Sequence, residues 1–132
     1  MPTKLPSSAV INHIRRQHHL KLILLHGSYA TGQIHPHSDI DIAVLSQDPT
    51  QNLDTLSLIR DLSAAFQADS VDLTNLNHAN PLLLKTVTNT ATLLSGHRAD
   101  FDQLQLLAFH RYSDYLPYLR AEHQFVTSRL NI

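Results

Sequence analysis

Short apolar and alternating runs along the chain predict three β-strands. Residues 20–26 are almost wholly apolar and end at Gly27, which is typical of a central strand buried on both faces. Residues 39–46 and 70–76 alternate between apolar and polar positions, as half-buried strands do. The apolar positions of these two strands are Ile40, Ile42, Val44, Val71 and Leu73, and the opposite positions are Asp39, Asp41, Ala43, Asp72 and Thr74. Each alternating strand therefore presents carboxylates on one face.

Apolar positions at helical spacing predict three helices in the first two thirds of the chain. Ser7 or Ser8 can serve as the N-cap of the first helix. The pairs Asp48-Pro49 and Asn80-Pro81 each combine a capping residue with a proline, and therefore predict where the second and third helices begin. The positions expected on the buried faces are Val10, Ile11 and Ile14, then Leu53, Leu56, Ile59, Leu62 and Phe66, and finally Leu83, Val87, Ala91 and Leu94.

The last third of the chain is also predicted to be helical. We expect the third helix to end at Gly96, as a C′ glycine, and residues 100–130 to form a helical region with a break or kink at Pro117. The expected order is helix, strand, loop, strand, helix, strand, helix, helix. This order indicates an α/β (α+β two-layer) fold in which helices pack on one sheet.

Length and composition narrow the class of protein. A chain of 132 residues is expected to form one domain, with a core at about 8–95 and a C-terminal helical region at about 98–132. A hydrophobic fraction of 42% with a net charge of −1 excludes intrinsic disorder and argues against direct nucleic-acid binding. The absence of cysteine excludes a disulfide scaffold and thiol catalysis. No apolar run approaches a membrane span or a signal peptide, so we expect a cytoplasmic protein without a membrane anchor.

Three carboxylates and a glycine–serine turn form the candidate site. Asp39 and Asp41 lie on one strand face, about 6.6 Å apart along the strand, and their like charges call for a cation. Mg²⁺ suits such a pair, because it takes one or two carboxylates and completes its coordination with phosphates. With Asp72 from the next strand, the acids could hold two ions. Gly27 and Ser28 end the preceding strand, where backbone N–H groups and a hydroxyl can hold phosphates.

Several polar residues allow competing interpretations. Asp69 is the alternative to Asp72 as third acid, although a role in a turn is favoured. The ten histidines do not show the spacing of a zinc site: His18 and His19 are adjacent, and a proline separates His35 from His37. We expect structural or solvent-exposed roles for them. Contact of His35 or His37 with phosphate or with a partner stays open.

Two further groups could meet a partner. Arg15 and Arg16 are expected at a solvated helix end, with contact to an acidic partner as the alternative. The C-terminal region carries Tyr112, Tyr115, Leu116, Tyr118 and Leu119. Core packing of the last helix is the favoured interpretation of this group, and a partner-binding surface is the alternative.

The glycine–serine pair and the two acids resemble a known signature. Gly27-Ser28, ten residues and then Asp39-x-Asp41 is the pattern of the polymerase-β-like nucleotidyltransferases. The runs Gly-Ser-Tyr-Ala-x-Gly and Ser-Asp-Ile-Asp resemble the minimal nucleotidyltransferases of that superfamily. The resemblance covers about residues 10–94, and Asp72 matches the third acid. It implies the small polymerase-β-like fold, a mixed sheet with helices packed on it.

The resemblance also implies an activity. Such proteins bind ATP with Mg²⁺ and transfer a nucleoside monophosphate to an acceptor hydroxyl, with release of pyrophosphate. By position, Gly27 and Ser28 would hold the triphosphate, Asp39 and Asp41 the two metal ions, and Asp72 would complete the metal site and help deprotonate the acceptor. Minimal members commonly serve as antitoxins that adenylylate a tyrosine of a HEPN-family RNase toxin.

We therefore expect an antitoxin protein adenylyltransferase with a HEPN-type toxin as its partner. Two alternatives stay open: a nucleotidyltransferase that acts on a small hydroxylated molecule, and a non-catalytic antitoxin that acts by binding its toxin. The chain departs from the family pattern at two positions. His26 stands where an apolar or aromatic residue is usual, and Thr31 replaces an arginine that many members carry, which removes a cation near phosphate or partner.

Overall fold

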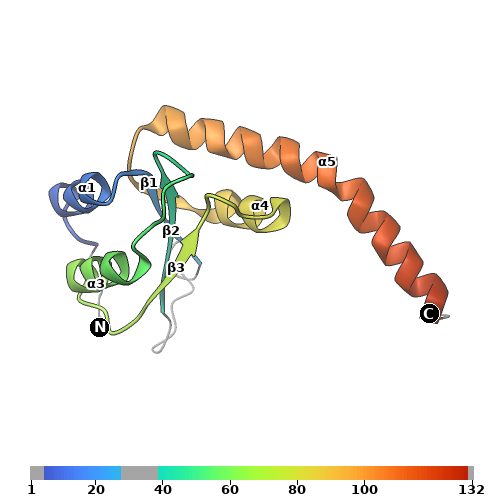
Figure 1. Cartoon of the computed structure of the whole chain (residues 1–132), viewed down its shortest axis with the longest axis horizontal. Coiled ribbons are helices and arrows are strands. Elements are labelled where there is room, and N and C mark those ends of the chain that lie inside the picture. The colour runs from blue at the N-terminus through green and yellow to red at the C-terminus, as the bar shows by residue number, and fades with distance from the viewer. Residues whose placement is uncertain (1–4, 28–38, 131–132) are drawn as a thin grey trace.

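The computed structural model describes residues 5–27 and 39–130 (Figure 1). Its elements, in chain order, are α1 (Ser8–Gln17), β1 (Leu20–His26), β2 (Ile40–Ser46), α3 (Thr55–Phe66), β3 (Val71–Asn75), α4 (Pro81–Thr90), β4 (Thr92–Ser95) and α5 (Arg98–Leu130). The α+β class predicted from the sequence is confirmed.

The four strands form one mixed sheet in the order β3-β2-β1-β4. Strand β1 is antiparallel to both of its neighbours, β2 and β4, whereas β2 and β3 are parallel. The prediction that residues 20–26 form a central strand is confirmed: Leu22 and Leu24 are buried on one face of the sheet, and Ile23 and Leu25 on the other. A strand that is apolar apart from Lys21 and His26 therefore occupies the position at which both faces are covered.

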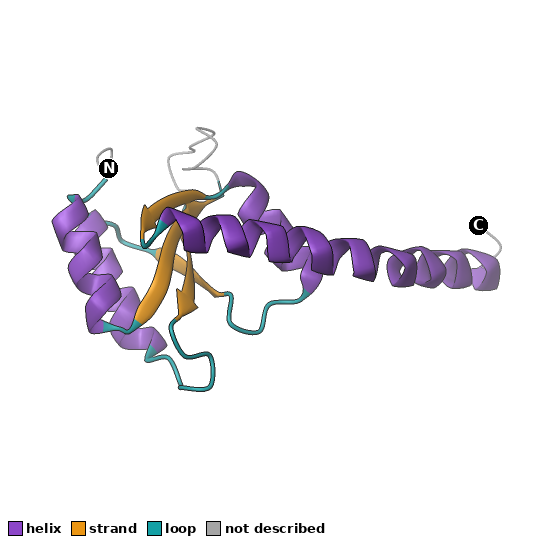
Figure 2. Cartoon of the chain, turned by 90° about the horizontal axis from the view of Figure 1, so that it is seen from above, coloured by secondary structure: helices purple, strands orange, loops and turns teal. Residues whose placement is uncertain are grey.

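Helices cover the sheet on both sides (Figures 1 and 2). On one side, α1 and α3 pack against the face that carries Ile40, Ile42 and Val44. On the other side, α4 and α5 pack against the face that carries Leu24 and Ala43. Because side chains alternate along a strand, Asp41 points to the same side of the sheet as Ala43. The predicted acidic face is thus the face covered in part by α4 and α5.

Capping residues decide where the helices begin. Ser7 caps α1 by accepting a hydrogen bond from Val10 N, and Asn80 caps α4 by accepting one from Leu83 N at 2.8 Å. Both starts agree with the sequence prediction. The predicted start at Asp48 is wrong: the Asp48 carboxylate accepts hydrogen bonds from the backbone and hydroxyl of Thr50 and so closes a local turn. Helix α3 begins only after Asp54, whose carboxylate caps it.

Several predicted buried positions are exposed instead. Leu56 of α3 is 82% exposed, while Leu58, Leu62 and Phe66, at i, i+4 and i+8, face the sheet. Val10 of α1 is exposed. In α4 the buried leucine is Leu84, and Leu83 is exposed. A run of adjacent leucines is compatible with either of two neighbouring apolar faces of a helix. Packing against the sheet determines which of the two faces is buried.

The segment before Gly96 is a strand, and not the helical turn that we predicted. Helix α4 ends at Thr90, and β4 pairs with β1 through Leu93 opposite Leu24. Gly96 has φ +124° and follows a strand, so it is no helix-ending glycine; a Cβ there would lie 2.5 Å from the Lys21 carbonyl oxygen. The pairing satisfies backbone groups of β1 that a longer helix would leave open at the edge.

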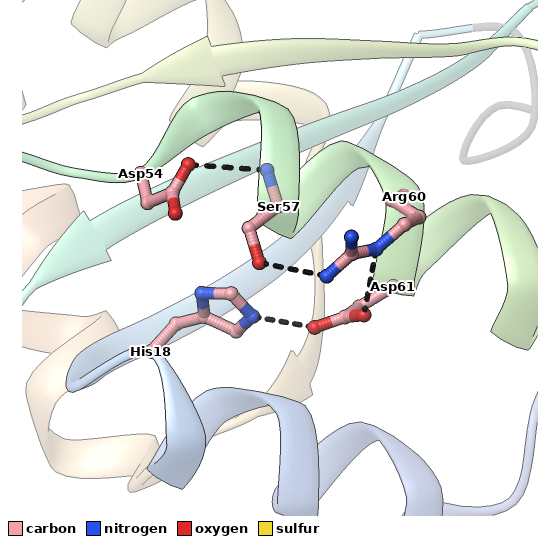
Figure 3. A network of polar contacts seen from close by, with 5 residues as sticks. All are labelled: His18, Asp54, Ser57, Arg60 and Asp61. Carbon is pink, nitrogen blue, oxygen red and sulfur yellow. Dashed lines mark hydrogen bonds and ion pairs between the residues drawn. The ribbon is translucent and has the colours of Figure 1, made fainter.

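Polar contacts join α1 to the rest of the fold. His18 Nε2 donates to Asp61 Oδ2 at 2.7 Å and so ties the end of α1 to α3 (Figure 3). This confirms the expected structural role of His18. The prediction that Arg15 lies at a solvated helix end is wrong. Its Nε donates a hydrogen bond to Ser95 Oγ at 2.8 Å and so links α1 to β4.

Helix α5 continues through Pro117, so of the break or kink predicted at this proline, the break does not occur. The axis of α5 changes direction over its second half, as expected of a helix that bends at a proline (Figure 1). Tyr118 is 72% exposed, and core packing therefore does not account for it. Within the two described segments, no helix is long and apolar enough to cross a membrane.

Candidate active site

Two carboxylates lie side by side at one end of the sheet. Asp41 of β2 is directly opposite Asp72 of β3 in the parallel register, and the nearby Asp72 carboxyl group helps to raise the pKa of Asp41. Asp41 is half-buried and Asp72 is exposed. The prediction that the two acids share one face of the sheet is confirmed by this register. Asp69, the alternative third acid, is exposed and precedes β3.

His26 lies beside these two acids, on the neighbouring strand β1. It lies opposite Asp41 in the antiparallel register of β1 and β2, and its Nε2 is buried without a hydrogen-bond partner. Sequence reasoning noted His26 only as a departure from the family pattern. The signal that could have found it is the alternation of Leu22, Leu24 and His26, which places the imidazole on the same face as the acids.

The three side chains shift one another's ionisation. Burial raises the pKa of Asp41 above its usual range, His26 opposes this, and the neighbouring Asp72 adds to it. Burial lowers the pKa of His26, against the attraction of Asp41 and Asp72. A bound cation would favour the ionised form of a partly buried carboxyl group that lies beside a second carboxylate.

Gly27 makes room for the Asp41 carboxylate. Its φ is +73°, in the left-handed region that favours glycine, and a Cβ there would lie 2.8 Å from Asp41 Cγ. Asp39 immediately precedes β2, is exposed, and contributes to the raised pKa of Asp41. The other predicted or open positions in this loop, Ser28, Thr31, His35 and His37, lie outside the described residues.

The donor set at this end of the sheet fits a hard divalent cation. Carboxylate oxygens are the ligands that Mg²⁺ takes in proteins, usually one or two of them together with phosphate oxygens and water. Asp41 and Asp72 supply such a pair, and the missing Cβ of Gly27 leaves room for the Asp41 carboxylate itself. Among the described residues, no group of three acids or histidines converges as a complete metal site.

Comparison with known proteins defines the class. The family model described as "Polymerase beta, Nucleotidyltransferase" matches residues 9–99. This chain belongs to that nucleotidyltransferase family. Among its relatives, the protein adenylyltransferase MntA of Shewanella oneidensis is 36% identical over 107 residues, which make up 81% of this chain and 73% of the relative.

Solved structures support the same assignment. A chain in a crystal structure of a toxin–antitoxin complex with AMP-PNP is 31% identical, with a TM-score of 0.73, over 96% of this chain and 99% of that chain. A second match, at 29% identity and a TM-score of 0.66, covers 95% of this chain and 96% of a chain in the complex of tri-AMPylated Shewanella oneidensis HEPN toxin with MNT antitoxin. The fold resemblance thus extends over nearly the whole chain.

Proposed function

We propose that this protein is an antitoxin that transfers AMP from ATP to a tyrosine of a HEPN-type toxin, with Mg²⁺ as cofactor, and thereby neutralises the toxin. The observation that carries the proposal is the placement of Asp41 opposite Asp72, with the Asp41 carboxylate packed directly against the backbone of Gly27. Nucleotidyl transfer needs this arrangement of paired carboxylates next to a turn that admits phosphates.

Each site residue has a role in the proposed transfer. Asp39, Asp41 and Asp72 would hold one or two Mg²⁺ ions, and Gly27 and Ser28 would hold the triphosphate. When bound, Mg²⁺ would supply positive charge that offsets the charge of the phosphates and of the departing pyrophosphate. Asp72 helps to remove the phenolic proton of the acceptor tyrosine. The phenolic oxygen then forms a bond to the α-phosphorus in line with the bond to the β-phosphate oxygen, which breaks and releases pyrophosphate.

The choice of a protein acceptor is supported by the relatives of this chain. The relative MntA is a protein adenylyltransferase, and a similar chain lies in a complex with a tri-AMPylated HEPN toxin. These relatives favour a protein over a small hydroxylated molecule as the acceptor.

Intact mass spectrometry tests the proposal. The purified protein is incubated with ATP, Mg²⁺ and the HEPN-type protein encoded beside its gene, and that protein is then weighed. We expect a gain of one or more AMP units, which is lost in Asp39→Asn/Asp41→Asn and on removal of Mg²⁺ with a chelator. The exposed neighbour Asp69→Asn is the matched control and should retain the gain.

Two outcomes would contradict the proposal. A stable complex with the toxin but no added mass would favour the non-catalytic antitoxin. Full transfer by the Asp39→Asn/Asp41→Asn variant would remove these acids from the reaction.

A further inference from the structure

The apolar face that α5 buries against the rest of the protein continues into the part of this helix that extends beyond the sheet and α4. Phe101, Leu104 and Ala108 are buried against α4 and β1. Tyr115 and Leu119 follow Ala108 after seven and eleven residues, two and three helical turns, and so lie on the same face of the helix. The core-facing stripe is therefore extended along a part of α5 that reaches past the sheet and α4 (Figures 1 and 2).

We call residues 113–130 of α5 the arm. Its apolar side chains follow the spacing i, i+3, i+4, i+10 and i+11, which forms one continuous stripe on a helix. This stripe comprises Tyr115, Tyr118, Leu119, Phe125 and Val126. The opposite face carries Ser113, Pro117, Arg120 and Gln124. The arm thus has the two-sided pattern of a helix that packs against another surface.

In the described structure, Tyr118, Phe125 and Val126 of the stripe are exposed, and Tyr115 and Leu119 are half-buried. Tyr118 is 72% exposed and Phe125 61%. A helix of this length gains little stability from its own backbone in water, and helices in proteins are held mainly by packing of an apolar face. Large exposed apolar stripes on soluble proteins mark surfaces that bind other proteins. The arm therefore needs an occupant.

The position of the arm favours the acceptor protein as that occupant. In Figure 1 the arm extends on the α4 side of the sheet, away from α1 and α3. Asp41 points to this same side, because it shares a strand face with Ala43 of the α4–α5 core. A protein seated on the arm is thus held on the side toward which the acids point. Holding an acceptor near the reacting groups is a requirement of transfer to a macromolecule.

The similar solved chain supports this choice over a second copy. It comes from a toxin–antitoxin complex, and its match to 96% of this chain leaves only about five residues unmatched, so most of the arm is included. The chain to which most of the arm is matched is thus one that is found together with a toxin.

We propose that the arm is the docking surface for the acceptor protein, with the stripe of Tyr115, Tyr118, Leu119, Phe125 and Val126 packed against an apolar helical face of that protein. This proposal rests on the function proposed above only for the identity of the partner. The arm carries two acidic and two basic residues, Asp114, Glu122, Arg120 and Arg129. Because these charges balance, the contact is apolar in character, and its affinity depends little on salt concentration.

Charge substitutions on the two faces of the arm test the proposal. Tyr115→Glu/Leu119→Glu places two negative charges on the stripe. Ser113→Glu/Gln124→Glu places the same two charges on the opposite, exposed face and is the matched control. Calorimetry measures the affinity of each variant for the adjacent HEPN-type protein and, separately, for AMP-PNP. We expect the stripe variant to bind the toxin at least tenfold more weakly and the control to bind within twofold of the native protein, with unchanged AMP-PNP affinity in both.

The readouts separate docking from transfer. Toxin affinity of the stripe variant within twofold of the native value would overturn the proposal. It would also be overturned if light scattering showed a dimer of this chain that the stripe variant loses while its toxin affinity is retained. If the native protein binds the toxin but adds no AMP, and the stripe variant still loses binding, the docking surface stands and the proposed transfer fails. Tyr118→Ala/Phe125→Ala, which adds no charge, should weaken toxin binding in the same direction.

Discussion

Asp41 and Asp72 lie directly opposite each other on the parallel strands β2 and β3, and the two acids carry like charges when both are ionised. Neighbouring carboxylates of this kind destabilise the folded protein at neutral pH in the absence of a cation. Pairs of like charges are typical of functional sites, where residues that serve function lower the stability of the folded protein. This pair has a direct consequence for the thermal stability of the protein.

We predict that Asp41→Asn raises the melting temperature of the metal-free protein at pH 7. Burial and Asp72 raise the pKa of Asp41 in the folded state, so above that pKa the ionised carboxylate disfavours folding. Asparagine removes this charge and can still donate a hydrogen bond to Asp72. Scanning calorimetry with a chelator present would measure the change, with Asp69→Asn as the control. A lower melting temperature for Asp41→Asn would contradict the prediction.

We further predict that Mg²⁺ and AMP-PNP together raise the melting temperature of the native protein but not that of Asp41→Asn. A ligand that binds only the folded state stabilises it in proportion to its occupancy. The same substitution should lower AMP transfer by about 100-fold or more, since metal charge stabilisation contributes several kcal/mol to such reactions. Equal stabilisation of both proteins by Mg²⁺ and nucleotide would place the cation elsewhere.

The two described glycines with positive φ should respond differently to alanine. Gly27→Ala places a Cβ 2.8 Å from Asp41 Cγ, so it displaces the carboxylate and should abolish AMP-PNP binding and transfer. Gly96→Ala meets the Lys21 backbone oxygen at 2.5 Å, far from the acids in the β1–β4 register, and should mainly lower stability. The left-handed backbone alone costs alanine about 1–2 kcal/mol at either position. Calorimetric affinity and thermal unfolding of both variants would separate the two effects.

The link between His18 and Asp61 should matter for stability and not for chemistry. The His18 side chain is 8% exposed and lies at the start of β1, at the opposite end of that strand from His26. Loss of a buried hydrogen bond to a charged group costs about 1–3 kcal/mol, so His18→Ala should lower the free energy of unfolding by this amount. Arg60→Ala removes an exposed 3.8 Å contact to the same carboxylate and an exposed hydrogen bond to Ser57 Oγ, and is the control. Urea unfolding measures both, and a loss of AMP-PNP affinity in His18→Ala would contradict the separation.

Local signals in the sequence were sufficient to predict strands β1, β2 and β3, but they did not predict the edge strand β4. The apolar run of β1 and the alternation of β2 and β3 each depend on a few adjacent residues, and the structure confirms them. Strand β4 spans only Thr92–Ser95, and such a short run follows helical periodicity as well as strand periodicity. Its assignment depends on pairing with β1, which is 69 residues away at Leu24 and Leu93. The start of α3 was missed for a related reason: Asp48 caps a local turn as readily as a helix.

The candidate site was predictable where spacing in the sequence determines geometry. The i, i+2 placement of Asp39 and Asp41, together with the strand phase of Asp72, led to the observed pair of carboxylates. His26 could be found only through the register of β1 against β2, which depends on the whole sheet. The arm of α5 was equally hidden, because a stripe of tyrosines and leucines has the same pattern whether it faces the protein's own core or a partner.

The last prediction concerns the ionisation of His26 in the metal-free protein. Burial lowers its pKa below the usual value near 6.5, and the charges of Asp41 and Asp72 partly oppose this effect. Replacing Asp41 with asparagine removes one of the two opposing charges, so the pKa of His26 should fall further in that variant. NMR titration of the imidazole in the presence of a chelator measures both values. Asp69→Asn is the control, because Asp69 is not among the charges that act on His26 and should leave its pKa unchanged. A rise of the His26 pKa in Asp41→Asn would contradict the prediction. It would show that the two side chains do not face each other across β1 and β2, and that His26 does not belong to the site.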